Sequence, residues 1–106
     1  MKFIITENKL DSIIFNHLDN KNFIIKETPD NYYFLRNEDD IYSTIRVVKI
    51  NGNCLIILDL VEELEQFFSI DYRYSKTVIK KYVEDSLNIT VHFTNPLKKG
   101  GIFTVK

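Results

Sequence analysis

The residue types that could do catalytic or metal chemistry are few and widely separated in this chain. Its two histidines, His17 and His92, and its single cysteine, Cys54, show none of the close spacings at which zinc ligands occur. Cys54 opens a continuous apolar run, which predicts a small buried hydrophobic residue rather than an exposed nucleophile. No glycine-rich phosphate loop, serine-nucleophile motif or paired-histidine zinc motif occurs. We therefore predict that the protein is not an enzyme and uses no cofactor or metal, although folding could still bring Cys54 and His92 together.

Two groups of acidic residues favour an ordinary solvated surface over a cation site. The run Glu38-Asp39-Asp40 neither alternates its carboxylates nor contains a glycine, as a calcium loop does. The acidic residues between positions 59 and 65 fall on the polar side of a predicted amphipathic helix, where they face water.

A set of aromatic and basic residues in the last third of the chain is the best candidate for an interaction surface. Tyrosine and arginine are enriched at the energetic centres of protein interfaces, and lysines contact phosphates in nucleic-acid complexes. The set therefore predicts either a protein-binding or a nucleic-acid-binding surface. Its members are Tyr72, Arg73, Lys76, Lys80, Lys81, Lys98 and Lys99.

The order of the predicted elements in this region is that of a winged helix-turn-helix: helix, connection, helix, strand, Lys-Gly loop, strand. The lysines at 76, 80 and 81 would lie on the groove-entering helix, and those at 98 and 99 in the wing. Three features oppose this interpretation. The isoelectric point is near 6.1 instead of basic. Glu84 and Asp85 would repel phosphates that they faced, and the predicted connection, residues 69–75, is longer than the usual turn of about three or four residues.

Composition and length predict a single globular domain over residues 1–106. The chain is 44% hydrophobic and carries a formal net charge of −1, so it has no strong overall field to attract a membrane or nucleic acid. One cysteine cannot form an intramolecular disulfide, which favours a reducing compartment. The apolar run at the N-terminus is too short for a signal peptide, and no later run approaches a membrane span.

Hydrophobic periodicity predicts an α+β fold, in which a β-meander and a C-terminal hairpin form an antiparallel sheet packed by about three helices. The strands are expected near residues 2–5, 23–26, 32–36, 41–50, 54–58, 89–94 and 102–105. Asn51-Gly52 favours a two-residue hairpin turn.

Each of the three helices is expected to bury one apolar stripe. The N-terminal helix runs from Thr6 to about Asn20, the second begins at its cap Asp59, and the third is capped by Ser75 or Asp71 and stopped by Asn88. The stripes are Leu10, Ile13, Ile14, His17 and Leu18; then Leu60, Val61, Leu64, Phe67 and Phe68; then Val78, Ile79, Tyr82, Val83 and Leu87.

Two segments resemble small proteins of tailed bacteriophages. The opening KFIITENKLDSIIFNHLDNKNF is similar to a recurrent N-terminus of such proteins, and FFSIDYRYSKTVIKKYVEDSLNITV is similar to a later block in them. The matching residues of the opening are Lys2, Ile4, Ile5, Thr6, Glu7, Leu10 and Leu18-Asp19. The resemblance covers roughly half of the chain and leaves residues 26–58 without a counterpart. It implies a phage origin and a location in the host cytoplasm or the virion, and it carries over no catalytic residues.

We therefore predict a non-enzymatic, phage-type protein-binding module. Its partner would be a phage or host protein, and the module would act as a minor virion or assembly component or as an inhibitor of a host protein. A winged helix-turn-helix-like nucleic-acid-binding protein is the alternative. No membrane partner is expected, and the oligomeric state stays open.

Overall fold

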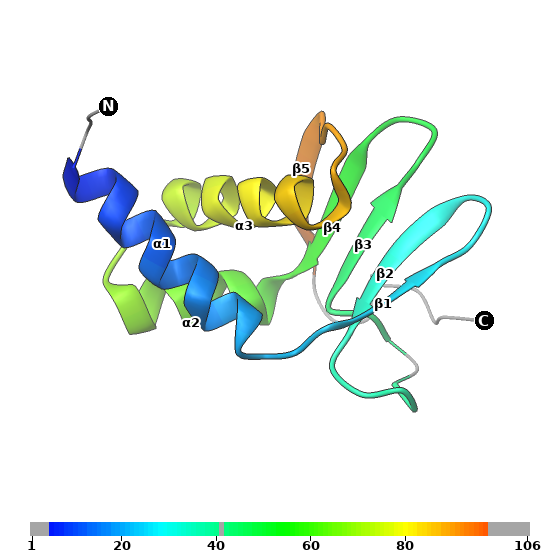
Figure 1. The fold of residues 1–106 in the computed structure, drawn as a ribbon, viewed down its shortest axis with the longest axis horizontal. Coiled ribbons are helices and arrows are strands. Elements are labelled where there is room, and N and C mark those ends of the chain that lie inside the picture. Colours follow the sequence, from blue (N-terminus) through cyan, green and yellow to red (C-terminus); the bar gives the residue numbers. More distant parts are fainter. Residues whose placement is uncertain (1–4, 41, 98–106) are drawn as a thin grey trace.

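The computed structural model describes residues 5–40 and 42–97, which form three helices and one five-stranded sheet (Figure 1). The helices are α1 (Ile5–Asp19), α2 (Leu58–Phe68) and α3 (Tyr72–Leu87). The strands are β1 (Ile24–Glu27), β2 (Asn31–Leu35), β3 (Ile45–Val48), β4 (Asn53–Ile57) and β5 (Phe93–Leu97). This arrangement confirms the predicted α+β class with a mostly antiparallel sheet.

The sheet is a meander with one parallel strand added at its edge. Strands β1 to β4 pair antiparallel in chain order, and β5 pairs parallel with β4. A parallel neighbour requires a long crossover, which α2 and α3 supply. The prediction of a strand over residues 89–94 followed by a loop from Asn95 was therefore wrong in position. Pro96 is tolerated in β5 because an edge strand leaves one side of its backbone without ladder hydrogen bonds.

The core lies between one face of the sheet and the three helices, which gather on the same side of the molecule in Figure 1. Tyr82 of α3 connects the layers: its ring lies 5.8 Å from that of Phe15 on α1 and 6.3 Å from that of Phe34 on β2, centroid to centroid. The fully buried side chains around it include Ile14, Leu18, Ile45, Val47, Ile56, Leu64, Val78, Ile79 and Val83. Burying each of the larger ones contributes about 1.5 to 3 kcal/mol before the entropy cost of folding.

The helix ends agree with the sequence in part. The Asp71 side chain caps α3 by accepting a 2.7 Å hydrogen bond from the Tyr74 backbone N–H, and Asn88 ends α3 in the left-handed conformation, as predicted. The prediction that Asp59 caps α2 was wrong, since the helix begins one residue earlier at Leu58 and its cap residue, Ile57, provides no side-chain hydrogen bond. Asp59 instead occupies the first turn, where a carboxylate favours the helix dipole.

Two predicted local features differ in detail. The strand predicted over residues 41–50 is confined to β3, and the following turn spans the four residues 49–52 instead of two. Of these four residues only Gly52 has a positive φ, 65°. The two-residue turn that Asn51-Gly52 favours needs a positive φ at both positions, so the turn is of another type. At the N-terminus, Ile5 begins α1 and so does not belong to a strand; the rest of that predicted strand, and the return strand at 102–105, lie outside the described residues.

The apolar stripes of the helices are wider than the surfaces that cover them. Leu60, Val61 and Leu64 are buried as expected, but Ile13 is 49% exposed and Phe67 is 66% exposed, so the prediction that these two residues lie in the core was wrong. None of the three described helices is long and apolar enough to cross a membrane.

Candidate functional site

Helix α3 is held rigidly enough to present its outer surface in one orientation. Asp71 caps its start, and only three residues, 69–71, separate it from α2. The phenolic oxygen of Tyr74 donates a 2.6 Å hydrogen bond to the Asp11 carboxylate, which joins the first turn of α3 to α1. Tyr74 therefore packs back onto the fold.

Four of the predicted interaction residues lie together on α3, and we call them the α3 outer face: Tyr72, Arg73, Lys76 and Lys80. The ring of Tyr72 is 43% exposed, and the Lys76 ammonium lies 4.8 Å from its centroid in a cation–π contact. No ion pair holds Arg73, Lys76 or Lys80 within the part of the chain that the structure describes. Tyr72 and Arg73 are exposed and Lys76 and Lys80 are half-buried, so the face presents an aromatic ring and an arginine flanked by two partly covered lysines.

The remaining predicted residues do not join this face. Lys81 is exposed, but its ammonium lies 3.5 Å from the Asp11 carboxylate, so it turns toward α1. Lys98 and Lys99 lie outside the described residues. Glu84, which the sequence places near the lysines, accepts a 2.8 Å hydrogen bond from the Val91 backbone N–H and so stabilises the approach to β5.

A second cluster, which the sequence analysis missed, surrounds Glu63 on α2. Its carboxylate lies 2.7 Å from His17 Nε2, 2.7 Å from Lys21 Nζ and 3.6 Å from the Arg36 guanidinium. We call these four residues the Glu63 corner. Burial raises the pKa of Glu63, but hydrogen bonds from Lys21 and His17 outweigh it, and the net pKa lies below the ordinary value. His17 also packs on Phe67 and Phe68, with ring centroids 4.8 and 5.3 Å away.

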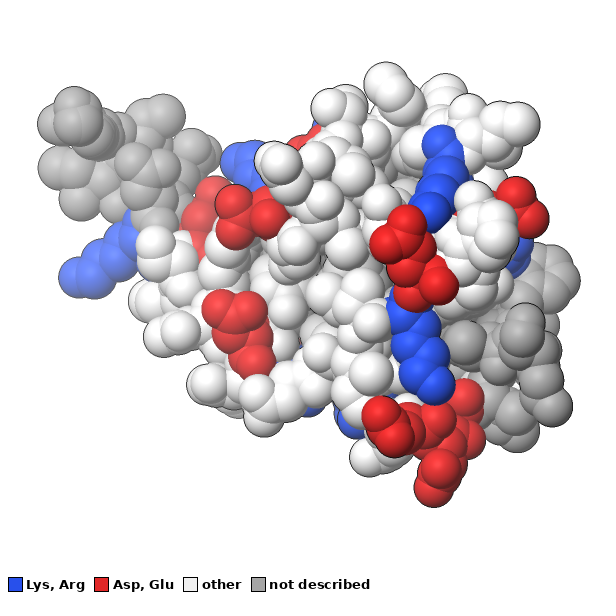
Figure 2. All heavy atoms as spheres, turned by 45° about the vertical axis from the view of Figure 1, so that its right-hand side comes forward, with Lys and Arg blue, Asp and Glu red and all other residues white. Residues whose placement is uncertain are grey.

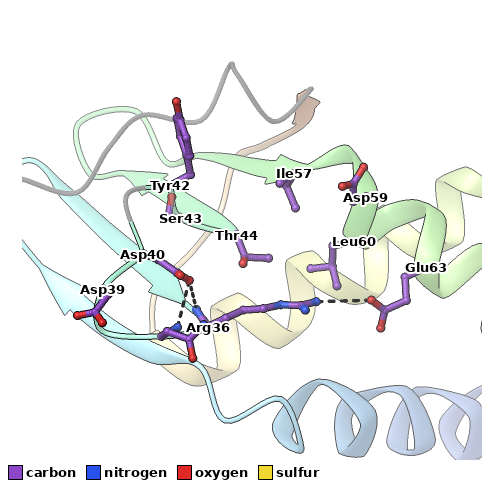
Figure 3. A pocket seen from close by; sticks show the side chains of 11 residues that line it. Arg36, Asp39, Asp40, Tyr42, Ser43, Thr44, Ile57, Asp59, Leu60 and Glu63 are labelled. Atoms are coloured by element: carbon purple, nitrogen blue, oxygen red, sulfur yellow. Dashed lines mark hydrogen bonds and ion pairs between the residues drawn. The ribbon is translucent and has the colours of Figure 1, made fainter.

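Two residues of the Glu63 corner, Arg36 and Glu63, line an open pocket of about 640 Å³ (Figure 3). Arg36 reaches across it from the end of β2 toward α2, and the Asp40 carboxylate accepts hydrogen bonds from the backbone N–H groups of Arg36 and Asn37. Ser43 lines the pocket, but its hydroxyl is buried and has no hydrogen-bond partner. A serine nucleophile needs a base within hydrogen-bond reach, and none is present here among the described residues.

The two remaining groups that could react, Cys54 and His92, differ in exposure. Cys54 is fully buried, as predicted, and burial, with a smaller effect of the Glu84 charge, raises its pKa to about 12. Its thiolate is therefore scarce at neutral pH. His92 is exposed, and its ring packs against the backbone of Gly52. No group of three or more His, Cys, Asp or Glu side chains suited to a metal ion occurs in residues 5–40 and 42–97.

Charge on the surface is mixed. On the face shown in Figure 2, acidic and basic side chains lie beside one another, and no large area of a single sign forms. An arrangement of this kind favours specific pairing with a complementary surface over attraction to any polyanion.

No protein-family model, curated protein or solved structure matches this chain. The resemblance to tailed-phage proteins therefore stays a prediction.

Proposed function

We propose that the protein is a non-enzymatic protein-binding module that engages an acidic partner surface through the α3 outer face. The observation that carries this proposal is the exposed Tyr72 ring, with the Lys76 ammonium 4.8 Å from it and Arg73 beside it. Tyrosine and arginine are the residue types that most often dominate interface energies.

Two properties of α3 support this use. Its capped first turn fixes Tyr72 and Arg73 on a rigid element, so little conformational entropy is lost when a partner binds. Its three cations have no ion pair among the described residues, and they would steer and select a partner that carries carboxylates around an apolar slot.

The chemistry of the remaining residues supports a non-enzymatic role. The thiol of Cys54 is buried and poorly ionised, and the hydroxyl of Ser43 has no base beside it among the described residues. A catalytic site needs a nucleophile, a base and a stabilising group in mutual reach.

The proposed partner is a phage or host protein. A minor virion or assembly component and an inhibitor of a host protein both need only a complementary surface, so the α3 outer face suits either role. The host cytoplasm or the virion is the location proposed with them.

The test is a quantitative pull-down from host cells, with and without nuclease, using the wild-type protein and a variant carrying Tyr72→Ala and Arg73→Ala. Lys26→Ala, which removes an exposed cation on β1, is the matched control. We expect a protein that is captured by the wild type and the control after nuclease treatment and is lost from the double variant. Equal capture by all three would refute the role of the α3 outer face.

Nucleic-acid binding is a second candidate, because the connection of three residues between α2 and α3 has the length usual in a helix-turn-helix. One observation does not fit this candidate: β5 pairs parallel with β4, and the wing of a winged helix-turn-helix does not require such a parallel pairing. Lys80→Glu combined with Lys98→Glu should abolish DNA binding if this geometry is used. Unchanged affinity at low salt would exclude it.

A further inference from the structure

Helix α2 carries a surface that complements the α3 outer face. It contains four carboxylates and no lysine or arginine. Only Glu63 is engaged by cations; Asp59, Glu62 and Glu65 have no ion pair within the part of the chain that the structure describes. No described ion pair joins α2 to α3. The carboxylates of α2 and the cations of α3 are therefore not paired with one another within one molecule.

The acidic surface of α2 surrounds an exposed aromatic side chain. Phe67 is 66% exposed and forms one wall of an open hollow of about 450 Å³. The rest of the wall is polar: Asp59, Glu62, Glu63 and Gln66. We call these five residues the α2 hollow. An apolar wall with a carboxylate rim suits an aromatic side chain that brings cations with it.

We propose that the α2 hollow receives the Tyr72–Lys76 pair of a second copy of this chain. The inference rests on the proposed function, because it names a partner for the same α3 outer face. In this contact the Tyr72 ring would pack on Phe67, and Lys76 and Lys80 would approach the carboxylate rim. Complementary charge is the reason for a second copy: within the described residues, Asp59 and Glu62 of the rim have no ion pair, and neither do the three cations of the α3 outer face.

The two kinds of contact have different roles. Exposed ion pairs contribute little free energy but determine which surfaces meet, whereas the two aromatic rings would supply the buried apolar area. Association should therefore be sensitive to salt and should also require Phe67 and Tyr72. Two reciprocal contacts would give a two-fold dimer, and a single repeated contact would give a chain of copies.

The experiment measures the mass of the purified protein by light scattering and sedimentation, from low micromolar to several hundred micromolar concentration. One variant reverses the acidic rim with Glu62→Lys and Gln66→Lys. The other reverses the basic face with Lys76→Glu and Lys80→Glu. The members of each pair lie four residues apart on one helix; Glu62 and Gln66 are exposed, and Lys76 and Lys80 are half-buried. None of the four belongs to the buried core, so the helices are expected to be retained, and circular dichroism checks this.

We expect the wild type to self-associate at low salt and to dissociate near 1 M salt, where the Debye length is about 3 Å. Each reversed variant alone should associate at least about tenfold more weakly, because like charges would then meet. A mixture of the two reversed variants should associate again, because the complementary charges are restored between unlike copies. A control variant with Lys9→Glu and Lys26→Glu has the net charge of the basic-face variant and should behave as the wild type does.

Three outcomes would overturn the inference: a wild type that stays monomeric at the highest concentration and low salt, reversed variants that associate as the wild type does, or a mixture that does not associate. Phe67→Ala gives an independent check: the ring is 66% exposed, and although it contacts His17 and Phe68, it is not one of the buried core residues. Circular dichroism checks that the variant is folded, and unchanged association of this variant would also overturn the inference. If the wild type is monomeric but the Tyr72-dependent capture of another protein persists, only this inference fails and the proposed function stands. If neither is observed, both fail.

Discussion

The Glu63 corner and the α3 outer face both contain several charged side chains, but the charges are paired only in the corner. In the corner, the Glu63 carboxylate of α2 is contacted by His17 of α1, by Lys21 just after α1, and by Arg36 just after β2. On the α3 outer face, the Lys76 ammonium lies over the Tyr72 ring, and none of the three cations has a carboxylate partner in residues 5–40 and 42–97. The corner therefore connects α1, α2 and the end of β2, whereas no described carboxylate pairs with the cations of the outer face.

Because of this difference, we expect the Glu63 corner to contribute to stability and the α3 outer face to contribute to recognition. Removing a charge that is matched within the fold leaves its partners unsatisfied, so stability falls. Removing an unmatched surface charge leaves the fold almost unchanged and alters only what the surface can attract. Substitutions in the two regions should consequently affect different measurements.

The largest expected effect on stability is that of His17→Ala in the Glu63 corner. It removes the hydrogen bond to Glu63 and the ring contacts with Phe67 and Phe68. We expect a loss of about 2 kcal/mol in the free energy of unfolding measured with urea. Asn16→Ala, an exposed neighbour on α1, is the control. An equal effect of both variants would show that the corner does not stabilise the fold.

The second prediction concerns the pH dependence of the same corner. The pKa of Glu63 is lowered in the folded protein, so its ionised form stabilises the fold above the ordinary pKa of 4.5, and this contribution is lost as pH falls through the lowered value. We expect Glu63→Gln to cost about 1 kcal/mol at neutral pH, a modest value because the side chain is 32% exposed. The difference from the wild type should shrink below pH 4.5 in urea titrations at several pH values. A difference that is constant from neutral to acidic pH would contradict the assigned role.

The third prediction tests the cap that orients the α3 outer face. Asp71→Ala removes the acceptor for the Tyr74 backbone N–H and should cost about 1 kcal/mol of stability, while Asp71→Asn should retain most of it. Thermal unfolding of the two variants gives the comparison. Equal stability of the alanine and asparagine variants would mean that the side-chain cap is unimportant.

The smallest expected effect on stability is that of Lys76→Ala combined with Lys80→Ala. Neither ammonium has an ion pair among the described residues, so the free energy of unfolding should stay within about 0.5 kcal/mol of the wild type. Capture of the protein partner should nevertheless decrease. A large loss of stability would show that the face belongs to the fold and would remove the contrast with the Glu63 corner.

Sequence patterns predicted the local elements well where the signal was itself local. The burial of Ile14, Leu18, Val78 and Ile79 follows from helical periodicity, and the cap at Asp71 and the stop at Asn88 follow from residue type. The exposure of Phe67 could not be predicted, because it depends on how much of the α2 stripe α1 covers. The edge position and parallel direction of β5 depend in the same way on where the crossover through α2 and α3 returns to the sheet.

The same distinction between local and long-range signals applies to the two candidate surfaces. The α3 outer face was predictable because its four residues lie within nine positions of one helix, Tyr72 to Lys80. The Glu63 corner combines positions 17, 21, 36 and 63, and no local spacing signals it. The inert state of Cys54 was expected from its apolar neighbours, and burial between the sheet and the helices raises its pKa to about 12.

The sequence by itself determined the α+β class, the three helices, the capped start of α3 and the cluster of tyrosine, arginine and lysine upon it, because each depends on residues close together in the chain. The tertiary structure alone decided which charges are matched. An ion pair depends on distances between segments far apart in sequence, and folding placed Glu63 beside His17, Lys21 and Arg36 while it left the cations of the α3 outer face without a carboxylate partner in the described residues.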